Sequence, residues 1–205
     1  MDLAIATPLL AVSAPVMLAI AVWVRLDSPG RVIFRQERVG LHGRTFNLLK
    51  FRSMVVGAQT MGAGLAVTEG DSRITKVGKI LRRLSLDELP QLINVVRGDM
   101  SIVGPRPTVP AQVAHYNDRQ RRRLSARPGI TGHAQVTGRN AIPWSQRIEL
   151  DLDYVDRWSL GRDIAIIART ALVVLRRQDT YRAEGGGGFD LPLRAPDTRS
   201  GDTLA

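Results

Sequence analysis

Residues 84–107 read LSLDELPQLINVVRGDMSIVGPRP and set the interpretation of the whole chain. The adjacent acids Asp87 and Glu88 stand just before Pro90, and a helix tolerates proline only in its first turn. Apolar residues follow at helical spacing until Gly98, which is a typical helix stop. The stretch therefore predicts a short helix that begins at two carboxylates, followed by an apolar run and by the rigid turn GPRP at residues 104–107.

Two interpretations of the acid pair remain open on this stretch alone. Asp and Glu are favoured in the first helical turn, where they complement the helix dipole, and Ser85 with Glu88 has the spacing of a capping box. Alternatively, a carboxylate at a helix start beside Arg106, which two prolines hold in place, suits a divalent metal and a phosphate.

The composition limits the class of protein. With 205 residues, of which 44% are hydrophobic, the chain is long enough for one domain with appendages. It has no cysteine, which excludes disulfides, thiolate metal sites and thiol catalysis. The net charge of +10 implies an anionic partner, which is nucleic acid, anionic lipid or a phosphorylated substrate.

An arginine cluster within residues 119–123 is the strongest nucleic-acid signal in the chain. The cluster lacks interleaved aromatic residues and any known binding module. We interpret it as a solvated or lipid-facing patch, and we expect no nucleic-acid partner.

Residues 3–24 form an uncharged run of 22 residues, long enough for a membrane helix. A straight span, a re-entrant helix and a buried core helix all fit this run, whereas a cleaved signal peptide fits poorly because no basic residue precedes it. Pro8 and Pro15 each remove one helical hydrogen bond and favour a kink. A hydroxyl such as that of Ser13 or Thr7 can bind a carbonyl that proline leaves free.

Local patterns predict the other elements. We expect a β-hairpin with strands at residues 31–38 and 45–51, which brings Lys50 to its end. Helical patterns cover three further segments, at residues 72–84, 109–124 and 163–177. The cationic face of the first suits anionic headgroups, and the last suits either an interfacial helix or one packed on the core.

Residues 84–107 gain specificity from four further segments in a fixed order. These segments are SPGRVIFRQERVG (28–40), KFRSM (50–54), RPGITGHAQVTGRN (127–140) and ELDLDYVDRWSLGRDI (149–164). Together they resemble the monotopic polyprenyl-phosphate phosphoglycosyl transferases, bacterial sugar transferases that begin glycan assembly on a membrane lipid. The resemblance runs from about residue 2 to about residue 178 and is to the small, catalytic-core type.

The resemblance implies an α+β fold in a small monotopic membrane protein. Residues 1–26 are expected to form a re-entrant membrane helix whose break is marked by Ser13 and Pro15, with both ends cytoplasmic. Residues 27–178 would form a cytoplasmic catalytic domain that contains the hairpin and amphipathic interfacial helices, at the bacterial inner (cytoplasmic) membrane. The Gly-rich residues 179–205 are expected to be a disordered tail.

The resemblance also implies an activity. A sugar-1-phosphate would pass from a UDP-sugar to a polyprenyl (undecaprenyl) phosphate and release UMP, as the first step of exopolysaccharide, O-antigen or glycoprotein assembly. Our mechanistic hypothesis is an attack by Asp87 on the sugar-bearing phosphorus, with an aspartyl phospho-sugar as intermediate. Glu88 is a candidate proton acceptor, and Asp87 or Glu88 would bind Mg²⁺.

Three cations are candidates to hold substrate phosphates: Lys50, Arg106 and Arg139. The alternative function is a membrane-anchored basic protein that binds nucleic acid or lipid without catalysis. The sequence names neither the sugar nor the oligomeric state.

Overall fold

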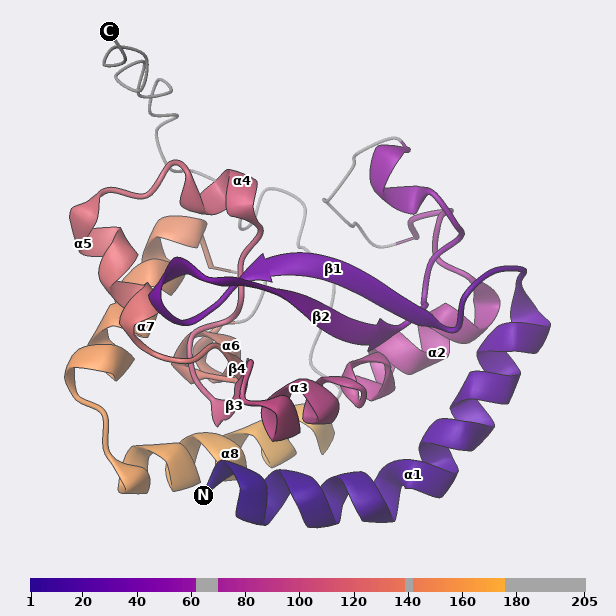
Figure 1. Ribbon diagram of the computed structural model, residues 1–205, viewed down its shortest axis with the longest axis horizontal. Helices are drawn as coiled ribbons and strands as arrows, with labels where there is room; N and C mark the ends of the chain where they lie inside the picture. The colour runs from indigo at the N-terminus through magenta and orange to yellow at the C-terminus, as the bar shows by residue number, and fades with distance from the viewer. Residues whose placement is uncertain (62–69, 139–141, 176–205) are drawn as a thin grey trace, which may run out of the picture.

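The computed structural model describes residues 1–61, 70–138 and 142–175 (Figure 1). Its helices are α1 (Asp2–Asp27), α2 (Lys76–Arg83), α3 (Gln91–Arg97), α4 (Pro110–Val113), α5 (Asp118–Arg121), α6 (His133–Thr137), α7 (Trp144–Asp156) and α8 (Leu160–Leu175). Its strands are β1 (Ile33–Val39), β2 (Thr45–Phe51), β3 (Ser101–Val103) and β4 (Gly129–Thr131). Short 3₁₀ turns are η1 (Leu41–Gly43), η2 (Ala58–Thr60), η3 (Leu86–Glu88) and η4 (Arg122–Ser125). This mixture of helices and small sheets confirms the α+β class.

The predicted hairpin is confirmed, since β1 and β2 pair antiparallel with Phe34 opposite Lys50. A second, parallel pair of strands, β3 and β4, was not predicted. Glycines allow this pair to form, because a Cβ added at Gly129 would lie 2.1 Å from the backbone nitrogen of Gly104. The RPG and GPRP motifs are therefore neighbours in space, and their small residues let two backbones touch.

Helix α1 is long and apolar enough to cross a membrane, and its axis bends along its length (Figure 1). One face packs on the protein through Ala6, Ile20 and Val24. The remaining surface exposes large apolar side chains, among them Leu9, Val12, Val16, Leu18 and Trp23.

Both ends of α1 are fixed to the strands. At the start, the carboxylate of Asp2 accepts hydrogen bonds from Ser101 Oγ at 2.9 Å and from the Ile102 amide at 3.2 Å. At the end, the guanidinium of Arg52 donates to the carbonyls of Val24 and Ser28 at 3.0 and 2.6 Å. A cation at these carbonyls also complements the helix dipole.

The middle of α1 contains both predicted break residues. The Ser13 hydroxyl donates to the carbonyl of Leu10 at 3.2 Å. Pro15 has no N–H, so the carbonyl it leaves without a helical donor is that of Ala11. Ser13 therefore does not compensate for Pro15 in the manner we expected.

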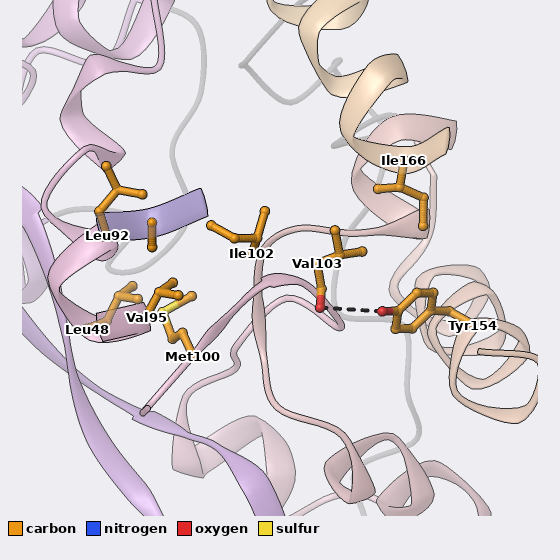
Figure 2. Close-up of a cluster of buried hydrophobic side chains, with 9 residues drawn as sticks. Leu48, Leu92, Val95, Met100, Ile102, Val103, Tyr154 and Ile166 are labelled. Carbon is orange, nitrogen blue, oxygen red and sulfur yellow. Dashed lines mark hydrogen bonds between the residues drawn. The ribbon is translucent and has the colours of Figure 1, made fainter. Parts of the chain in front are cut away.

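The main core lies where α1, α3, β2, β3, α7 and α8 meet, and Figure 2 shows most of its side chains. It consists of Ala6, Leu48, Leu92, Val95, Met100, Ile102, Val103, Tyr154 and Ile166. Figure 2 also shows the Tyr154 hydroxyl directed at the carbonyl of Val103, to which it donates at 3.4 Å. A second cluster joins the end of α1 to β2 and α2.

The helix predicted at residues 72–84 is shorter, because Thr75 caps it and accepts from the Gly78 amide at 3.0 Å. Arg73, expected on the cationic face, is buried instead. It pairs with Asp71 at 2.6 Å and donates to the carbonyl of Ala58. These contacts compensate the buried charge of Arg73, which the helical pattern had placed on the solvent-exposed face.

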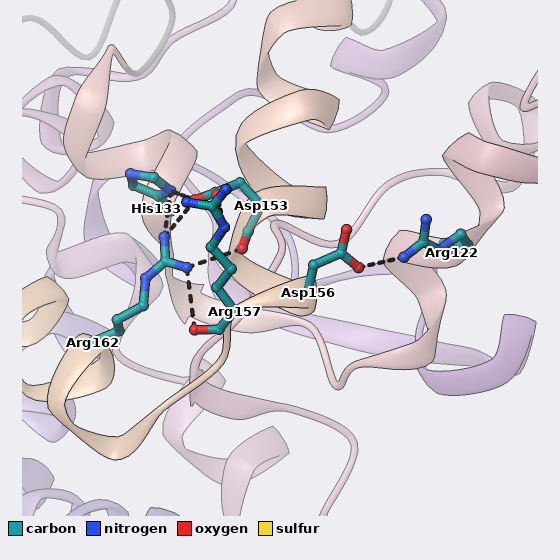
Figure 3. Close-up of polar contacts among 6 residues, drawn as sticks. All are labelled: Arg122, His133, Asp153, Asp156, Arg157 and Arg162. Atoms are coloured by element: carbon teal, nitrogen blue, oxygen red, sulfur yellow. Dashed lines mark hydrogen bonds and ion pairs between the residues drawn. The ribbon is translucent and has the colours of Figure 1, made fainter.

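The segment at 109–124 is two short helices and a 3₁₀ turn, not one helix. Asn117 interrupts it, because its side chain and that of Gln120 form a capping box that starts α5. The arginine cluster is also not a free cationic patch. Arg119 and Arg122 pair with Glu149 and Asp156 of α7, as Figure 3 shows for Arg122.

For the amphipathic segment at residues 163–177 the sequence allowed an interfacial helix or one packed on the core, and each describes one face of α8. Ile166 is buried in the core, whereas Ile164 and Leu172 are exposed. Ion pairs fix its start, since Arg162 binds Asp153 of α7 at 2.5 Å, beside His133 and Arg157 (Figure 3). The predicted tail at 179–205 lies outside the described residues.

Candidate active site

The acid pair lies in the 3₁₀ turn η3, one turn before α3. Ser85, which precedes the turn, has a left-handed backbone with φ 56° and caps nothing with its side chain. The capping-box interpretation of Ser85 and Glu88 is therefore wrong. Helix α3 begins only after Pro90 and ends at Gly98, whose φ of 82° is left-handed, as the sequence predicted.

The Glu88 carboxylate instead binds two predicted site residues. Its Oε1 accepts from Lys50 Nζ at 2.7 Å and from Arg106 Nη2 at 2.8 Å. Lys50 comes from the end of β2 and Arg106 from the GPRP turn. Burial alone would raise the pKa of Glu88, but the charges of Arg106 and Lys50 outweigh it and hold the pKa below its usual range.

Asp87 is in the opposite situation. Its side chain is buried, and within the described part of the chain its carboxylate accepts no hydrogen bond. Burial raises its pKa, and the nearby charge of Lys50 offsets this only in part. The two adjacent acids therefore differ, because Glu88 is ionised and engaged while Asp87 has both oxygens free.

Both acids line one open pocket of about 1510 Å³. Lys50 and Arg106 line it too, as do the further cations Arg38 and Arg82. Another part of its wall is apolar and comes from α1, the residue after η3, β4 and α8, with the residues Ile5, Leu9, Leu89, Ile130 and Ile167. Such a pocket can hold a polyanion beside a hydrocarbon chain.

Arg38 and Arg82 are pocket residues that our sequence reasoning missed. Arg38 donates to the carbonyl of Pro107 at 3.1 Å. Burial, with the charge of Arg106 added, lowers its pKa to about 10. The hairpin register could have indicated Arg38. Phe34 pairs with Lys50, so the two side chains lie on the same face of the hairpin, and Arg38, four residues after Phe34, lies on that face too.

Not every predicted residue is placed in this pocket. Ser13 and Pro15 lie in α1 and do not line it. Arg139 lies outside the described residues. Within the ranges that are described, no three His, Cys, Asp or Glu side chains gather as a metal site. Mg²⁺ commonly needs only one or two protein carboxylates together with substrate phosphates, and Asp87 meets that requirement.

Comparisons with known proteins identify the family of the chain. The model of the family described as "Bacterial sugar transferase" matches residues 1–177. Over 174 residues the chain is 45% identical to the uncharacterized sugar transferase EpsL of Bacillus subtilis, covering 85% of each chain.

Two relatives carry the name UDP-glucose:undecaprenyl-phosphate glucose-1-phosphate transferase. The one from Caulobacter vibrioides is 44% identical over 190 residues, which cover 88% of this chain and 70% of that protein. The one from Xanthomonas campestris is 50% identical over 175 residues, which cover 82% of this chain and 36% of that longer protein. The chain therefore belongs to the bacterial sugar transferase family.

Proposed function

We propose that this protein transfers a sugar-1-phosphate from a UDP-sugar to a polyprenyl phosphate, with release of UMP, to begin the assembly of a glycan. Named relatives act on UDP-glucose and undecaprenyl phosphate, and one in Salmonella typhimurium is an undecaprenyl-phosphate galactose phosphotransferase. The observation that carries the proposal is a buried, unengaged carboxylate, Asp87, beside an acid that two cations hold.

Asp87 is the proposed nucleophile. One of its oxygens attacks the phosphorus that bears the sugar, and the bond from that phosphorus to the UMP oxygen breaks. A phosphate oxygen of the lipid then attacks the same phosphorus and displaces the carboxylate, which returns Asp87 to its starting form. A carboxylate that is desolvated and accepts no hydrogen bond is a stronger nucleophile than a solvated one, which supports this role.

Glu88 is better suited to holding charge than to accepting a proton. Its pKa lies below the usual range because of Arg106 and Lys50, so it is a weak base in the arrangement described. We propose that it keeps these two cations pointed at the pocket until substrate phosphates compete for them. Arg106 is the more exposed of the two, with 44% of its side chain accessible against 18% for Lys50, and is better placed to meet the donor first.

We also propose that the site binds Mg²⁺, which suits the carboxylates of the pocket. Asp87 would hold it, because Glu88 already shares one carboxylate oxygen with two cations. When bound, the ion would offset the charge of the donor diphosphate.

The membrane arrangement is also proposed. The exposed apolar surface of α1, together with exposed Ile164 and Leu172 on α8, supports contact with lipid. The bend of α1 and its attachment at both ends to the same body support a re-entrant helix whose ends lie on the cytoplasmic face (Figure 1). The exposed Lys79 and Ile80 of α2 suit a headgroup layer.

UMP release tests this function. The full-length protein in nanodiscs would be given undecaprenyl phosphate, Mg²⁺ and a panel that includes UDP-glucose and UDP-galactose. We expect turnover with one donor, and a loss of at least about a thousandfold in Asp87→Asn. Asp118→Asn, an exposed acid of α5, is the matched control and should keep full activity.

Omitting the lipid acceptor separates the two mechanisms. One UMP per protein without acceptor supports the covalent intermediate, whereas no UMP until the acceptor is added indicates direct transfer. Absence of UMP with every donor would refute the transferase proposal. It would favour the alternative of a basic binding protein, which the pairing of Arg119 and Arg122 with carboxylates does not support.

A further inference from the structure

The turn that presents Arg106 is held by its carbonyl oxygens. Three successive carbonyls each have a donor: Pro105 accepts from the Gly129 amide at 3.0 Å, Arg106 from Arg123 Nη2 at 3.0 Å, and Pro107 from Arg38 at 3.1 Å. Proline cannot donate, so this turn depends on groups outside it for its orientation.

Arg123 is the most deeply placed of these donors. Both it and its ion-pair partner Asp151, from α7, have side chains that are 2% accessible. The Arg123 guanidinium also donates to the Tyr116 hydroxyl at 2.6 Å and lies over the Tyr116 and Trp144 rings, 5.7 and 5.8 Å from their centroids. Both terminal nitrogens of the guanidinium are therefore engaged, whereas its Nε is buried without a partner among the described residues, and the bond to the Arg106 carbonyl is held by these contacts.

Stability alone is a weak explanation for this pair. Removing two charges from water is unfavourable, and apolar residues of similar size often replace a buried ion pair without loss of stability. An apolar pair cannot reproduce two contacts, the donors to the Tyr116 hydroxyl and to the Arg106 carbonyl, and only the second reaches a candidate site residue.

We propose that Arg123 is a positioning residue for the transfer reaction, oriented by Asp151, which sets the direction of Arg106 through its backbone carbonyl. This inference rests on the proposed function, in which Arg106 binds substrate phosphate. Arg123 and Asp151 also line the pocket, but only 2% of each side chain is accessible, so we assign Arg123 to positioning and not to contact with the reacting atoms.

A neighbouring pair is the matched control. Arg122 and Asp156 form an ion pair between the same two elements, η4 and α7 (Figure 3). Arg122 directly precedes Arg123, and Asp156 follows Asp151 by five residues. Their side chains are 58% and 44% accessible, and neither binds the GPRP turn. Arg122→Met should change activity by less than about twofold, because exposed ion pairs contribute little.

The informative variant replaces both buried charges. Arg123→Met alone would leave Asp151 buried and unpaired, so loss of folding would explain any loss of activity. Arg123→Met with Asp151→Leu removes both charges and should keep Tm within a few degrees of the wild type. We expect kcat/KM for the UDP-sugar to fall about 10- to 100-fold, since a small displacement of a binding group has effects of that size.

A double-mutant cycle with Arg106→Ala shows whether the effect passes through Arg106. In that background the Arg123→Met, Asp151→Leu pair should lower kcat/KM no further, while its small effect on Tm stays the same. An equal fall in both backgrounds would overturn the inference, as would full activity of the Arg123→Met, Asp151→Leu protein in the presence of Arg106.

Hydrogen exchange keeps the inference testable if the proposed function fails. Should the wild type release no UMP with any donor, the amides of Arg106, Thr108 and Gly129 would be compared by exchange in the membrane-bound protein. Faster exchange in the Arg123→Met, Asp151→Leu protein, but not in Arg122→Met, would support the positioning role. Unchanged exchange in both would overturn it.

Discussion

Asn94 offers a sharp test of how the core supports the site. It lies fully buried in α3, and its side-chain amide joins α3 to the part of β2 that precedes Lys50. Its Oδ1 accepts from the Leu49 amide at 3.0 Å, and its Nδ2 donates to the Asn47 carbonyl at 2.9 Å and to Asp99 at 3.0 Å. Asn94→Ala removes all three hydrogen bonds at once.

The expected size follows from these bonds. Each contributes about 1 kcal/mol, so Asn94→Ala should reduce the free energy of unfolding by about 3 kcal/mol, and more if the Leu49 amide stays buried without an acceptor. For a chain of this length that corresponds to a fall in Tm of about 6–12 °C. Because Leu49 precedes Lys50, kcat/KM for UMP release should fall as well.

Thermal unfolding of the detergent-solubilised protein at one fixed scan rate would measure the fall. Asn94→Asp is the companion variant, since it keeps the acceptor for Leu49 but loses both donors and faces the Asp99 carboxylate. It should be at least as unstable at neutral pH and should recover as acid protonates the new pair. A fall in Tm below about 2 °C for Asn94→Ala would refute our account of the bridge from α3 to β2.

Three further outcomes are expected. Asp87→Asn should raise Tm at pH 7, because the raised pKa of Asp87 makes its ionisation favour the unfolded chain; the difference should vanish as pH falls below about 4, where both proteins carry a neutral side chain. Gly78→Ala should destabilise the protein severely, since a Cβ there would lie 2.0 Å from the Ser53 carbonyl oxygen, and a lower Tm with weaker activity would show it. Chelation by EDTA should stop UMP release and Mg²⁺ should restore it, so unchanged turnover in EDTA would argue against the metal.

Local sequence patterns predicted the elements whose formation depends on residues close together in the chain. The β1–β2 hairpin, the stop of α3 at Gly98 and the long apolar helix α1 each follow from a few adjacent residues. The β3–β4 pair could not be predicted in this way. Each strand has three residues, and the contact that allows them to pair is between glycines 25 positions apart, Gly104 and Gly129.

Buried arginines were the main source of error. Arg73 and Arg123 were interpreted as surface charges because a helical pattern assigns every cation to solvent. Their burial depends on specific partners, Asp71 nearby in sequence and Asp151 in a distant helix, which no periodicity reveals.

The sequence predicted which side chains would gather in one pocket, but not how they contact one another, and their roles in a reaction stay predictions. Family resemblance selected Asp87, Glu88, Lys50 and Arg106, and the last three are in direct contact. That Glu88 is engaged while Asp87 stays free depends on where two distant cations are delivered, and adjacent acids look equivalent in a sequence. Arg139 stays a prediction.

The attachment of α1 at both ends has a mechanical consequence. Asp2 is tied to β3, which leads into the turn of Arg106, and Val24 is tied to Arg52, two residues after Lys50. Any force that changes the curvature of α1 must therefore move those two attachment points relative to each other. If α1 lies in lipid as we propose, the spacing between Lys50 and Arg106, the two cations proposed to bind phosphate, would vary with the thickness and lateral pressure of the bilayer, and so would the reaction rate.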